Sequence, residues 1–448
     1  MSSGELFSGL FVPEPIREAT SDQAWLQAML DAESALAAAE AEAGLIPKAA
    51  ADAIAGACEA GDFDPQAIVR DGRSSGNPVP PLVAALRERV GGDAAGFVHH
   101  GATSQDVMDT AAVLIASRAL ALIRAELDGV AAACADLADE HRGTLMAGRT
   151  LLQQALPTTF GLKAAGWLDS LVAAGERIGS VSLAVQLGGA AGTLASLGPD
   201  GQRVAELIAD RLGLEAPTLP WHTARLRVAD LGSSLALAAG VLEKVAMDLV
   251  LLSQTEVGEV AESSAGGRGG SSALPHKRNP VGAVLTIACA RRVRGAAGVL
   301  LEAMPQEHER AAGAWQSEWA PLTEALALTG GAASALWEAL DGLEVRPDRM
   351  HENLEATGGA LMAESVVTTL AGRVGQQRAR ELVDAAAARA LDAQSSFREV
   401  LVGDEGVRAE LSEEEIDRAL DPAAYLGSAD AFIDRALARH RGYLEDRS

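Results

Sequence analysis

The chain has few cysteines and no long apolar run, and both shortages narrow the class of protein. Its 448 residues include only three cysteines, Cys58, Cys134 and Cys289, and none stands at the spacing of a metal or redox motif. We interpret them as buried thiols in a reducing compartment. No apolar stretch reaches the roughly 18 residues of a membrane span, and no basic-then-apolar start indicates a signal peptide. We therefore expect a cytoplasmic protein that does not cross a membrane.

Positive charge is also scarce. Lysine and arginine number 37 against 62 aspartates and glutamates, which gives a formal net charge of −25. Such a balance disfavours nonspecific binding to nucleic acid or to an anionic membrane. If the ligand is itself an anion, the few basic residues must be concentrated where it binds.

Aromatic residues are only 3% of the chain, and alternating β-branched runs are nearly absent. Alanine, leucine, glutamate and arginine dominate, so we predict an all-α protein. Long helices are apolar around much of their circumference, which favours burial in a bundle shared by a homo-oligomer. A large monomeric bundle is the alternative.

The long helical segments are expected at residues 21–43 (capped by Ser21), 104–140, 158–185, 228–262 and 280–303. The domains are expected at 1–102, 103–343 and 344–448.

The segment from Gly266 to Pro280 carries the most chemistry. Its glycines allow movement and positive φ angles, and Ser271 and Ser272 are followed by Pro275-His276-Lys277-Arg278-Asn279. A hydroxyl on such a loop beside fixed positive charge suits proton transfer next to a carboxylate. The alternative is a plain linker, although linkers seldom combine these residue types.

A second motif, His99 to Thr110, precedes a long helix. Thr103 or Ser104 can cap that helix, and a capped N-terminus with free N–H groups binds a carboxylate well. The alternative is an ordinary N-cap without a ligand. Because His99, His100 and Gly101 come directly before it, we favour a binding site.

Two further segments place arginines at the start of a predicted helix or within a run of polar residues. Arg225 and Arg227 follow Trp221-His222 where cations oppose the helix dipole, so they face an anion or form an exposed basic turn. Arg310 ends a polar cluster before Trp315 and Trp319, which share a helix face and indicate packing. The glycine-rich 188–193 stretch lacks the lysine and strand of a phosphate loop, so we interpret it as structural.

The loop text Gly270-Ser271-Ser272-Ala273-Leu274-Pro275-His276-Lys277-Arg278-Asn279 resembles the Gly-Ser-Ser-x-Met-Pro-x-Lys-x-Asn signature of the fumarase/aspartase superfamily. Leu274 replaces methionine, a swap that conserves volume. The sequence around Trp221 and His308 is similar to that of the bacterial 3-carboxy-cis,cis-muconate cycloisomerases, and this resemblance covers essentially the whole chain. It implies a three-domain helical protomer in a homotetramer, with each active site built from three subunits.

Within the superfamily, Leu151 favours the cycloisomerases. Amine lyases such as adenylosuccinate lyase have histidine in the motif Thr-His-x-Gln, where this chain keeps Thr150 and Gln153. An amine must be protonated to leave, whereas a carboxylate leaves as the anion of an acid with a pKa near 4. An adenylosuccinate lyase-like enzyme, an inactive homologue and a non-catalytic helical oligomer are the alternatives.

The resemblance implies ring closure of a tricarboxylate, 3-carboxy-cis,cis-muconate, to 4-carboxymuconolactone in protocatechuate catabolism. Ser271 would move the proton at the carbon next to a carboxylate, although Ser272 is not excluded, and Lys277 and Asn279 would stabilise the developing charge. No cofactor is implied, and the eight histidines show no metal-ligand spacing. Substrate-binding candidates are Thr103, Ser104, Gln105, His100, Arg149, Gln153, Arg225, Ser272 and Arg310.

Overall fold

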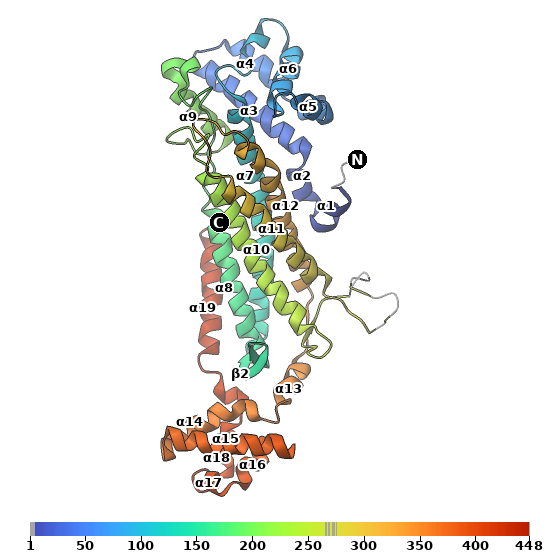
Figure 1. Cartoon of the computed structure of the whole chain (residues 1–448), viewed down its shortest axis with the longest axis vertical. Helices are drawn as coiled ribbons and strands as arrows, with labels where there is room; N and C mark the ends of the chain where they lie inside the picture. Colours follow the sequence, from blue (N-terminus) through green and yellow to red (C-terminus); the bar gives the residue numbers. More distant parts are fainter. Residues whose placement is uncertain (1–4, 265–266, 268, 271–273, 275, 448) are drawn as a thin grey trace. The chain divides into compact units, whose positions relative to one another are not determined.

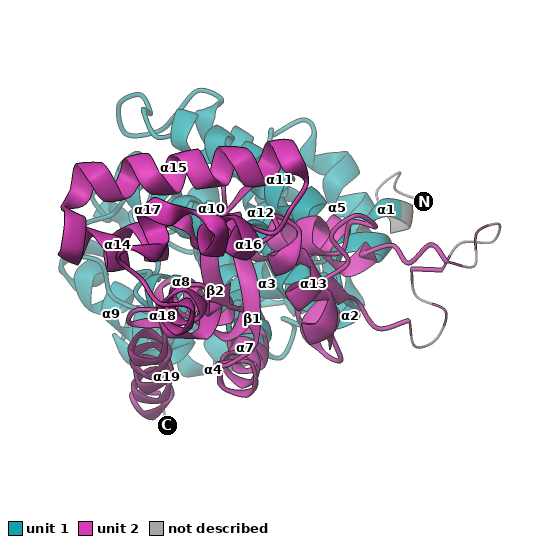
Figure 2. Cartoon of the chain, turned by 90° about the horizontal axis from the view of Figure 1, so that it is seen from below, with its two compact units in different colours: residues 1–128, 174–244, 285–336 teal, residues 129–173, 245–284, 337–448 magenta. Residues whose placement is uncertain are grey.

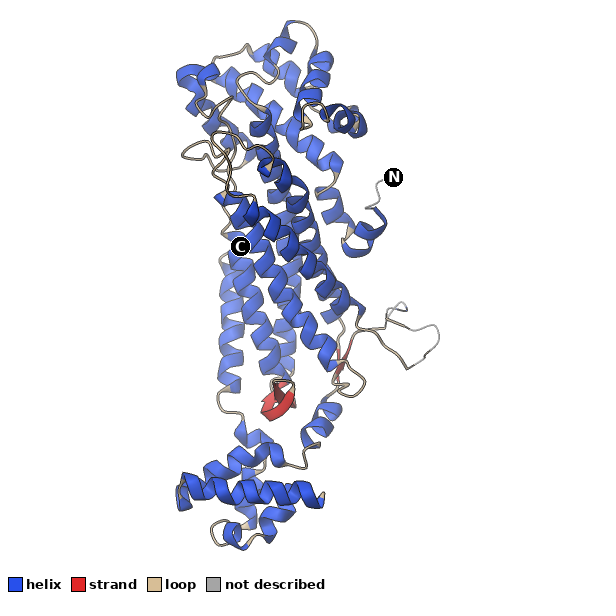
Figure 3. Ribbon diagram, viewed as in Figure 1, coloured by secondary structure: helices blue, strands red, loops and turns tan. Residues whose placement is uncertain are grey.

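The structure, a computed structural model, describes residues 5–447 except 265–266, 268, 271–273 and 275. Its regular secondary structure is almost entirely α-helical, and the described strands form two short antiparallel pairs (Figure 3). The prediction of an all-α chain is confirmed. None of the described helices is long and apolar enough to cross a membrane.

The helices and strands follow one another in a single chain order. The helices of the first half are α1 Glu5–Phe11, α2 Glu14–Ala19, α3 Asp22–Glu42, α4 Lys48–Ala55, α5 Pro65–Gly72, α6 Val79–Val90, α7 Ser104–Glu140, α8 Phe160–Gly179 and α9 Gly201–Leu212. Those of the second half are α10 Leu226–Leu252, α11 Val281–Glu302, α12 Ala314–Leu340, α13 Pro347–Glu355, α14 Ala363–Val374, α15 Gln376–Ala393, α16 Phe397–Gly403, α17 Glu405–Arg408, α18 Glu413–Ala419 and α19 Ala429–Glu445. The strands are β1 Leu145–Thr150, β2 Gln153–Thr159, β3 Val260–Ala261 and β4 Glu344–Val345.

The chain divides into two compact units, each made of three separate segments (Figure 2). The unit boundaries fall inside the long helices α7, α8, α10, α11 and α12 rather than at the predicted domain limits after residues 102 and 343. The three-domain division therefore stays a prediction. Unit 1 comprises residues 1–128, 174–244 and 285–336, and unit 2 comprises residues 129–173, 245–284 and 337–448.

In unit 1, α3 packs against α9 through a core that includes Leu36 and Ala39 on one side and Val204 and Ile208 on the other. Figure 1 shows α3, α4, α6 and α9 gathered beside the start of α7. The Ser21 hydroxyl accepts a hydrogen bond from Ala24 N at 3.1 Å, so the predicted N-cap of α3 is confirmed. Ala102, just before α7, packs against the same core.

In unit 2, helices α14 to α18 surround their own core, and α16 and α18 each begin with a capping box, at Ser396 and Ser412. Strands β1 and β2 form a hairpin in which Thr150 pairs with Gln153. The two residues between them, Leu151 and Leu152, have positive φ angles of 50° and 64°. Bulky residues seldom adopt this conformation, so the turn is strained.

Two predicted helices are shorter than expected. The pattern from 158 to 185 predicts one helix, but α8 ends at Gly179. The pattern from 228 to 262 predicts one continuous helix, but α10 ends at Leu252. The chain then turns through Gly258, whose φ is 65°, and enters strand β3, which pairs with β4. Gly258 lies beyond the end of α10 and allows the turn that leads into β3, which periodicity alone does not show.

Candidate active site

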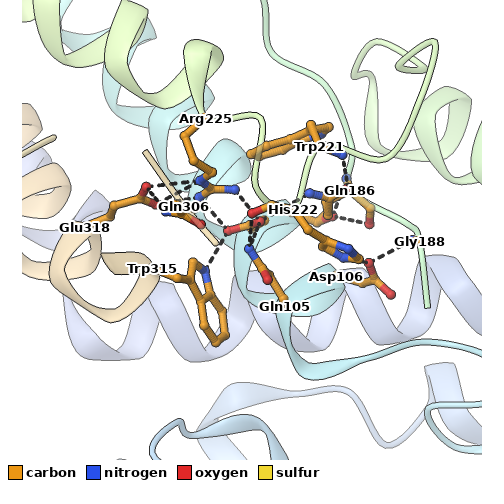
Figure 4. Close-up of polar contacts among 12 residues, drawn as sticks. Gln105, Asp106, Gln186, Gly188, Trp221, His222, Arg225, Gln306, Trp315 and Glu318 are labelled. Carbon is orange, nitrogen blue, oxygen red and sulfur yellow. Dashed lines mark hydrogen bonds and ion pairs between the residues drawn. The ribbon is translucent and has the colours of Figure 1, made fainter. Parts of the chain in front are cut away.

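The N-terminus of α7 is fixed by one buried carboxylate, Asp106. Its Oδ2 accepts hydrogen bonds from Thr103 N at 2.9 Å and from Gly189 N at 3.0 Å, and its Oδ1 accepts one from Gly188 N at 2.9 Å. Nε2 of His222 lies 2.7 Å from the same Oδ1 (Figure 4). Asp106 therefore joins three segments that are distant in sequence at the start of the helix.

Arg310 lies at the same helix end. Its Nη1 donates to the Thr103 hydroxyl at 3.2 Å, and its Nη2 donates to the carbonyl oxygens of Gly189 at 3.2 Å and Ala190 at 3.0 Å. The structure thus brings together two predicted site residues, Thr103 and Arg310. A guanidinium, a hydroxyl and a helix N-terminus form an arrangement suited to a carboxylate. Ser104, the first residue of α7, is partly exposed there.

Arg225 is bound by the protein's own carboxylates. It donates to both oxygens of Asp109, at 2.7 and 3.0 Å. It also donates to Glu318 at 2.5 Å (Figure 4). Burial disfavours its cation, but the two carboxylates outweigh burial and raise the pKa of Arg225. The side chain is only 2% exposed. These surroundings do not support the prediction that Arg225 binds substrate; they indicate a structural ion cluster.

Aromatic and amide side chains complete this cluster. Trp315 Nε1 donates to Asp109 at 3.0 Å, and the Trp315 ring meets Trp319 edge-on at 4.9 Å, as the predicted packing pair. Gln105 is fully buried and donates to the carbonyl oxygen of His222 at 2.8 Å. Gln105 therefore connects α7 to the 222 segment, and its position does not support direct substrate contact.

Two consecutive histidines precede this helix end, and each contacts a buried glutamate of α3. Nδ1 of His99 lies 2.5 Å from Glu33 Oε1, and Nδ1 of His100 lies 2.8 Å from Glu40 Oε1. Burial raises the pKa of Glu40 to about 7, although the hydrogen bond to His100 opposes this rise. Burial disfavours the charged form of His99, but the bond to Glu33 outweighs it, and the pKa of His99 is raised.

The other predicted cations and amides lie in unit 2. Arg149, on β1, forms a two-pronged pair with the fully buried Glu259 at 2.9 and 2.6 Å. Asn353 donates to the same carboxylate at 2.8 Å. Gln153 is exposed where β2 begins, and Leu151 at the hairpin turn is 96% exposed. The hairpin is thereby tied at Arg149 to the chain just before β3.

The residues on either side of the predicted catalytic segment, Gly266 to Pro280, are held by hydrogen bonds. Glu262 accepts hydrogen bonds from Gly282 N and Ala283 N, each at 2.9 Å, and so caps α11. Arg278 donates to Glu262 O at 2.9 Å and to Glu344 at 2.6 Å. Hydrogen bonds from Arg346 and Arg278 lower the pKa of Glu344 to about 2.

The predicted catalytic residues are only partly described. Lys277 is exposed, and Asn279 donates from its backbone and its side chain to Gly269 O at 2.9 and 3.0 Å. Ser271 and Ser272, the predicted proton donor and its neighbour, lie outside the described residues.

Sequence reasoning missed most of the buried partners, namely Glu33, Glu40, Glu259 and Glu318. Asp106 and Asp109 were present in the predicted motif but without a role. Glutamates at 33 and 40 within an alanine-rich helix are a usable signal, because buried charges need partners. Within the described part of the chain, no cluster of three or more histidine, cysteine, aspartate or glutamate residues suits a metal ion.

Comparison with known proteins shows the family of the chain. A family model described as lyase matches residues 13–295. The chain belongs to this lyase family. A second model, described as the adenylosuccinate lyase C-terminus, matches residues 359–436 of the lyase chain. The fumarase/aspartase resemblance and its fold are thereby confirmed.

Similar proteins match over nearly the whole lyase chain. It is 46% identical to a 3-carboxy-cis,cis-muconate cycloisomerase of Pseudomonas aeruginosa, covering 98% of this chain and 97% of that protein. A nitrosuccinate lyase of Streptomyces davaonensis is also 46% identical, covering 96% and 94%. The crystal structure of the 3-carboxy-cis,cis-muconate lactonizing enzyme from Pseudomonas putida superposes with a TM-score of 0.94 at 45% identity, covering 98% of this chain and 100% of that chain.

Proposed function

We propose that the chain is a 3-carboxy-cis,cis-muconate cycloisomerase that forms 4-carboxymuconolactone. The observation that carries this proposal is the full-length similarity to enzymes of that name at 46% identity. Leu151 adds chemical support, because an exposed leucine cannot protonate an amine leaving group where amine lyases have histidine.

In the proposed reaction, a carboxylate oxygen of the substrate adds to a conjugated double bond. Electron density moves to the carbon beside a second carboxylate, and Ser271 protonates that carbon. Lys277 and Asn279 stabilise the negative charge on the serine oxygen and the substrate. The net change replaces one C=C π bond with one C–O bond and one C–H bond, with no redox step, and the serine oxygen regains its proton from water. Ser272 remains the alternative proton carrier.

Substrate carboxylates need local positive charge in a protein of net charge −25. Thr103, Ser104 and the N-terminus of α7 bind one carboxylate in this proposal, with Arg310 beside them. His100, Arg149 and Gln153 are the candidates for the remaining carboxylates. Arg225 and Gln105 hold the frame of the site, because both are buried among protein partners.

A homotetramer in the cytoplasm belongs to the same proposal. Large apolar side chains remain exposed on unit 1, among them Leu237 on α10 at 59% and Leu301 on α11 at 48%. Exposed apolar side chains on long helices favour association between copies. Light scattering coupled to gel filtration measures the mass directly, and a monomer at working concentration would contradict this part.

Nitrosuccinate lyase is the second candidate, favoured by a relative of equal identity. Nitrite leaves as a stable anion, so this reaction also needs no acid at Leu151. The leucine therefore argues against amine lyases but does not separate these two activities.

An ultraviolet assay that follows loss of the conjugated diene of 3-carboxy-cis,cis-muconate tests the proposal. Nitrosuccinate and adenylosuccinate are assayed separately, by the fumarate that each would release. We expect turnover of the muconate, and a drop in kcat of several orders of magnitude for Ser271→Ala with an unchanged oligomeric mass. Ser170→Ala, at an exposed position on α8, is the control. Turnover of nitrosuccinate alone would replace the proposed activity with the second candidate.

A further inference from the structure

The Glu40–His100 contact has no role in the proposed chemistry, yet it lies three residues before the Thr103 helix cap. Glu40 is fully buried, and its Oε1 is 2.8 Å from Nδ1 of His100. Its other oxygen, Oε2, is buried without a hydrogen-bond partner. A buried carboxylate with a single partner is costly unless a proton or a cation accompanies it.

The His100 side chain is open on its other side. It is 37% exposed, while Glu40 is completely covered. Because Nδ1 is taken by Glu40, Nε2 is the ring nitrogen left for a ligand. A carboxylate that accepts from Nδ1–H fixes the ring's orientation and makes Nε2 more basic, so Nε2 becomes a donor once the pair takes up a proton.

The charged groups around this pair are few. Glu33 and His99 form the neighbouring pair, and Asp106 of α7 accepts its hydrogen bonds from backbone groups and His222. Arg87 of α6 donates to the carbonyl oxygen of Val98. Arg211 of α9 is paired with Glu42 at the surface. The charged groups that act on Glu40 are one acid, Glu33, and the two histidines, and Oε2 of Glu40 has no hydrogen-bond partner, so a proton on the pair would compensate the buried charge.

We propose that Glu40 is a positioning residue for His100 and that the Glu40–His100 pair takes up a proton when a substrate carboxylate binds at His100. Without that proton, the pair carries one negative charge, which repels the incoming anion. With the proton, it is neutral overall and presents an N–H donor. The substrate therefore binds the protonated form better, and linkage requires proton uptake on binding.

The raised pKa of Glu40, about 7, places this exchange near neutral pH. Below that pH the pair already holds its proton, and binding takes up little. Above it the pair must gain a proton, so the affinity for substrate falls by up to about tenfold for each unit of pH. This inference rests on the proposed function only for the identity of the ligand.

Calorimetry of the full-length Ser271→Ala variant with 3-carboxy-cis,cis-muconate, at pH 8 in phosphate and in Tris, measures the proton uptake. The two buffers differ in ionisation enthalpy, so the difference in heat counts protons. We expect about one proton per site, and close to none after Glu40→Gln is added. Glu42→Gln, at an exposed position on the same helix, should keep the uptake. Equal uptake with and without Glu40→Gln would overturn the proposal.

A second measurement does not depend on folding of the variant. In the wild-type enzyme, KM should rise between pH 7 and 9 while kcat changes less, because the pair acts on binding. A KM that is constant over this range would also overturn the inference. If the wild type turns over nitrosuccinate instead, the proposed function fails, and the same two-buffer titration with nitrosuccinate tests the proton pair separately.

Discussion

Asp106 and His222, which are 116 positions apart in the sequence, form a buried contact of 2.7 Å between Oδ1 and Nε2. The same carboxylate accepts backbone hydrogen bonds from Thr103, Gly188 and Gly189. One side chain thus fixes the helix end, the glycine turn and the 222 segment together. The position of the Thr103 hydroxyl and of the carbonyl groups that hold Arg310 depends on this carboxylate.

Replacing Asp106 with asparagine should therefore weaken both stability and substrate binding. The amide would place an NH2 group opposite N–H donors, leaving buried groups unpaired, at a cost of about 3 kcal/mol. We expect a lower thermal unfolding midpoint and a raised KM. Asp139→Asn on the exposed part of α7 is the control, since its partner Arg142 is at the surface. An Asp106→Asn enzyme with wild-type stability and KM would contradict the assigned role.

Arg310 is the cation that the structure places at the α7 helix end. Arg310→Lys keeps the charge but loses the fork that reaches Thr103 and two carbonyl groups. We expect KM for 3-carboxy-cis,cis-muconate to rise roughly tenfold to a hundredfold, as for loss of a charged hydrogen bond, with a smaller change in kcat. Arg211→Lys, at the surface of α9, should change neither constant. Unchanged KM in Arg310→Lys would remove Arg310 from the substrate site.

Local signals predicted the helices well. Ser21 begins α3, Ser104 begins α7 and Pro280 precedes α11, because caps and periodicity act over a few residues. Partners distant in sequence were harder to predict. The sequence left open whether Arg225 faces an anion or forms an exposed basic turn, and in the structure its partners are Asp109 and Glu318, which are 116 and 93 positions away. Spacing along the chain cannot distinguish such internal carboxylates from those of a substrate.

The buried ion cluster of Arg225, Asp109 and Glu318 should contribute to stability rather than to substrate binding. Arg225→Lys cannot satisfy Asp109 and Glu318 together, because a single ammonium replaces a planar fork with bonds to both. Leaving a buried carboxylate without its partner costs about 3 kcal/mol. We expect a lower unfolding midpoint with KM little changed once the protein is folded. Arg227→Lys, on a partly exposed residue two positions on, should be nearly neutral. A large rise in KM without loss of stability would return Arg225 to the substrate site.

Glu40 should stabilise the fold less as the pH rises, even though it assists binding. Its pKa is raised from 4.5 to about 7 in the folded chain, so the folded state holds this proton more tightly than the unfolded state does. The sign follows directly: the contribution to stability is full below pH 4.5 and is lost as the pH rises through 7. The difference corresponds to about 3 kcal/mol at most.

Glu40→Gln removes the buried charge while keeping an oxygen for His100. We expect the variant to match the wild type at pH 5 and to unfold at a higher temperature at pH 8, with an affinity for substrate that no longer falls as the pH rises. Glu42→Gln should follow the wild-type curve throughout. If Glu40→Gln were less stable than the wild type at pH 8, the buried carboxylate would be a stabilising ion pair rather than a proton carrier.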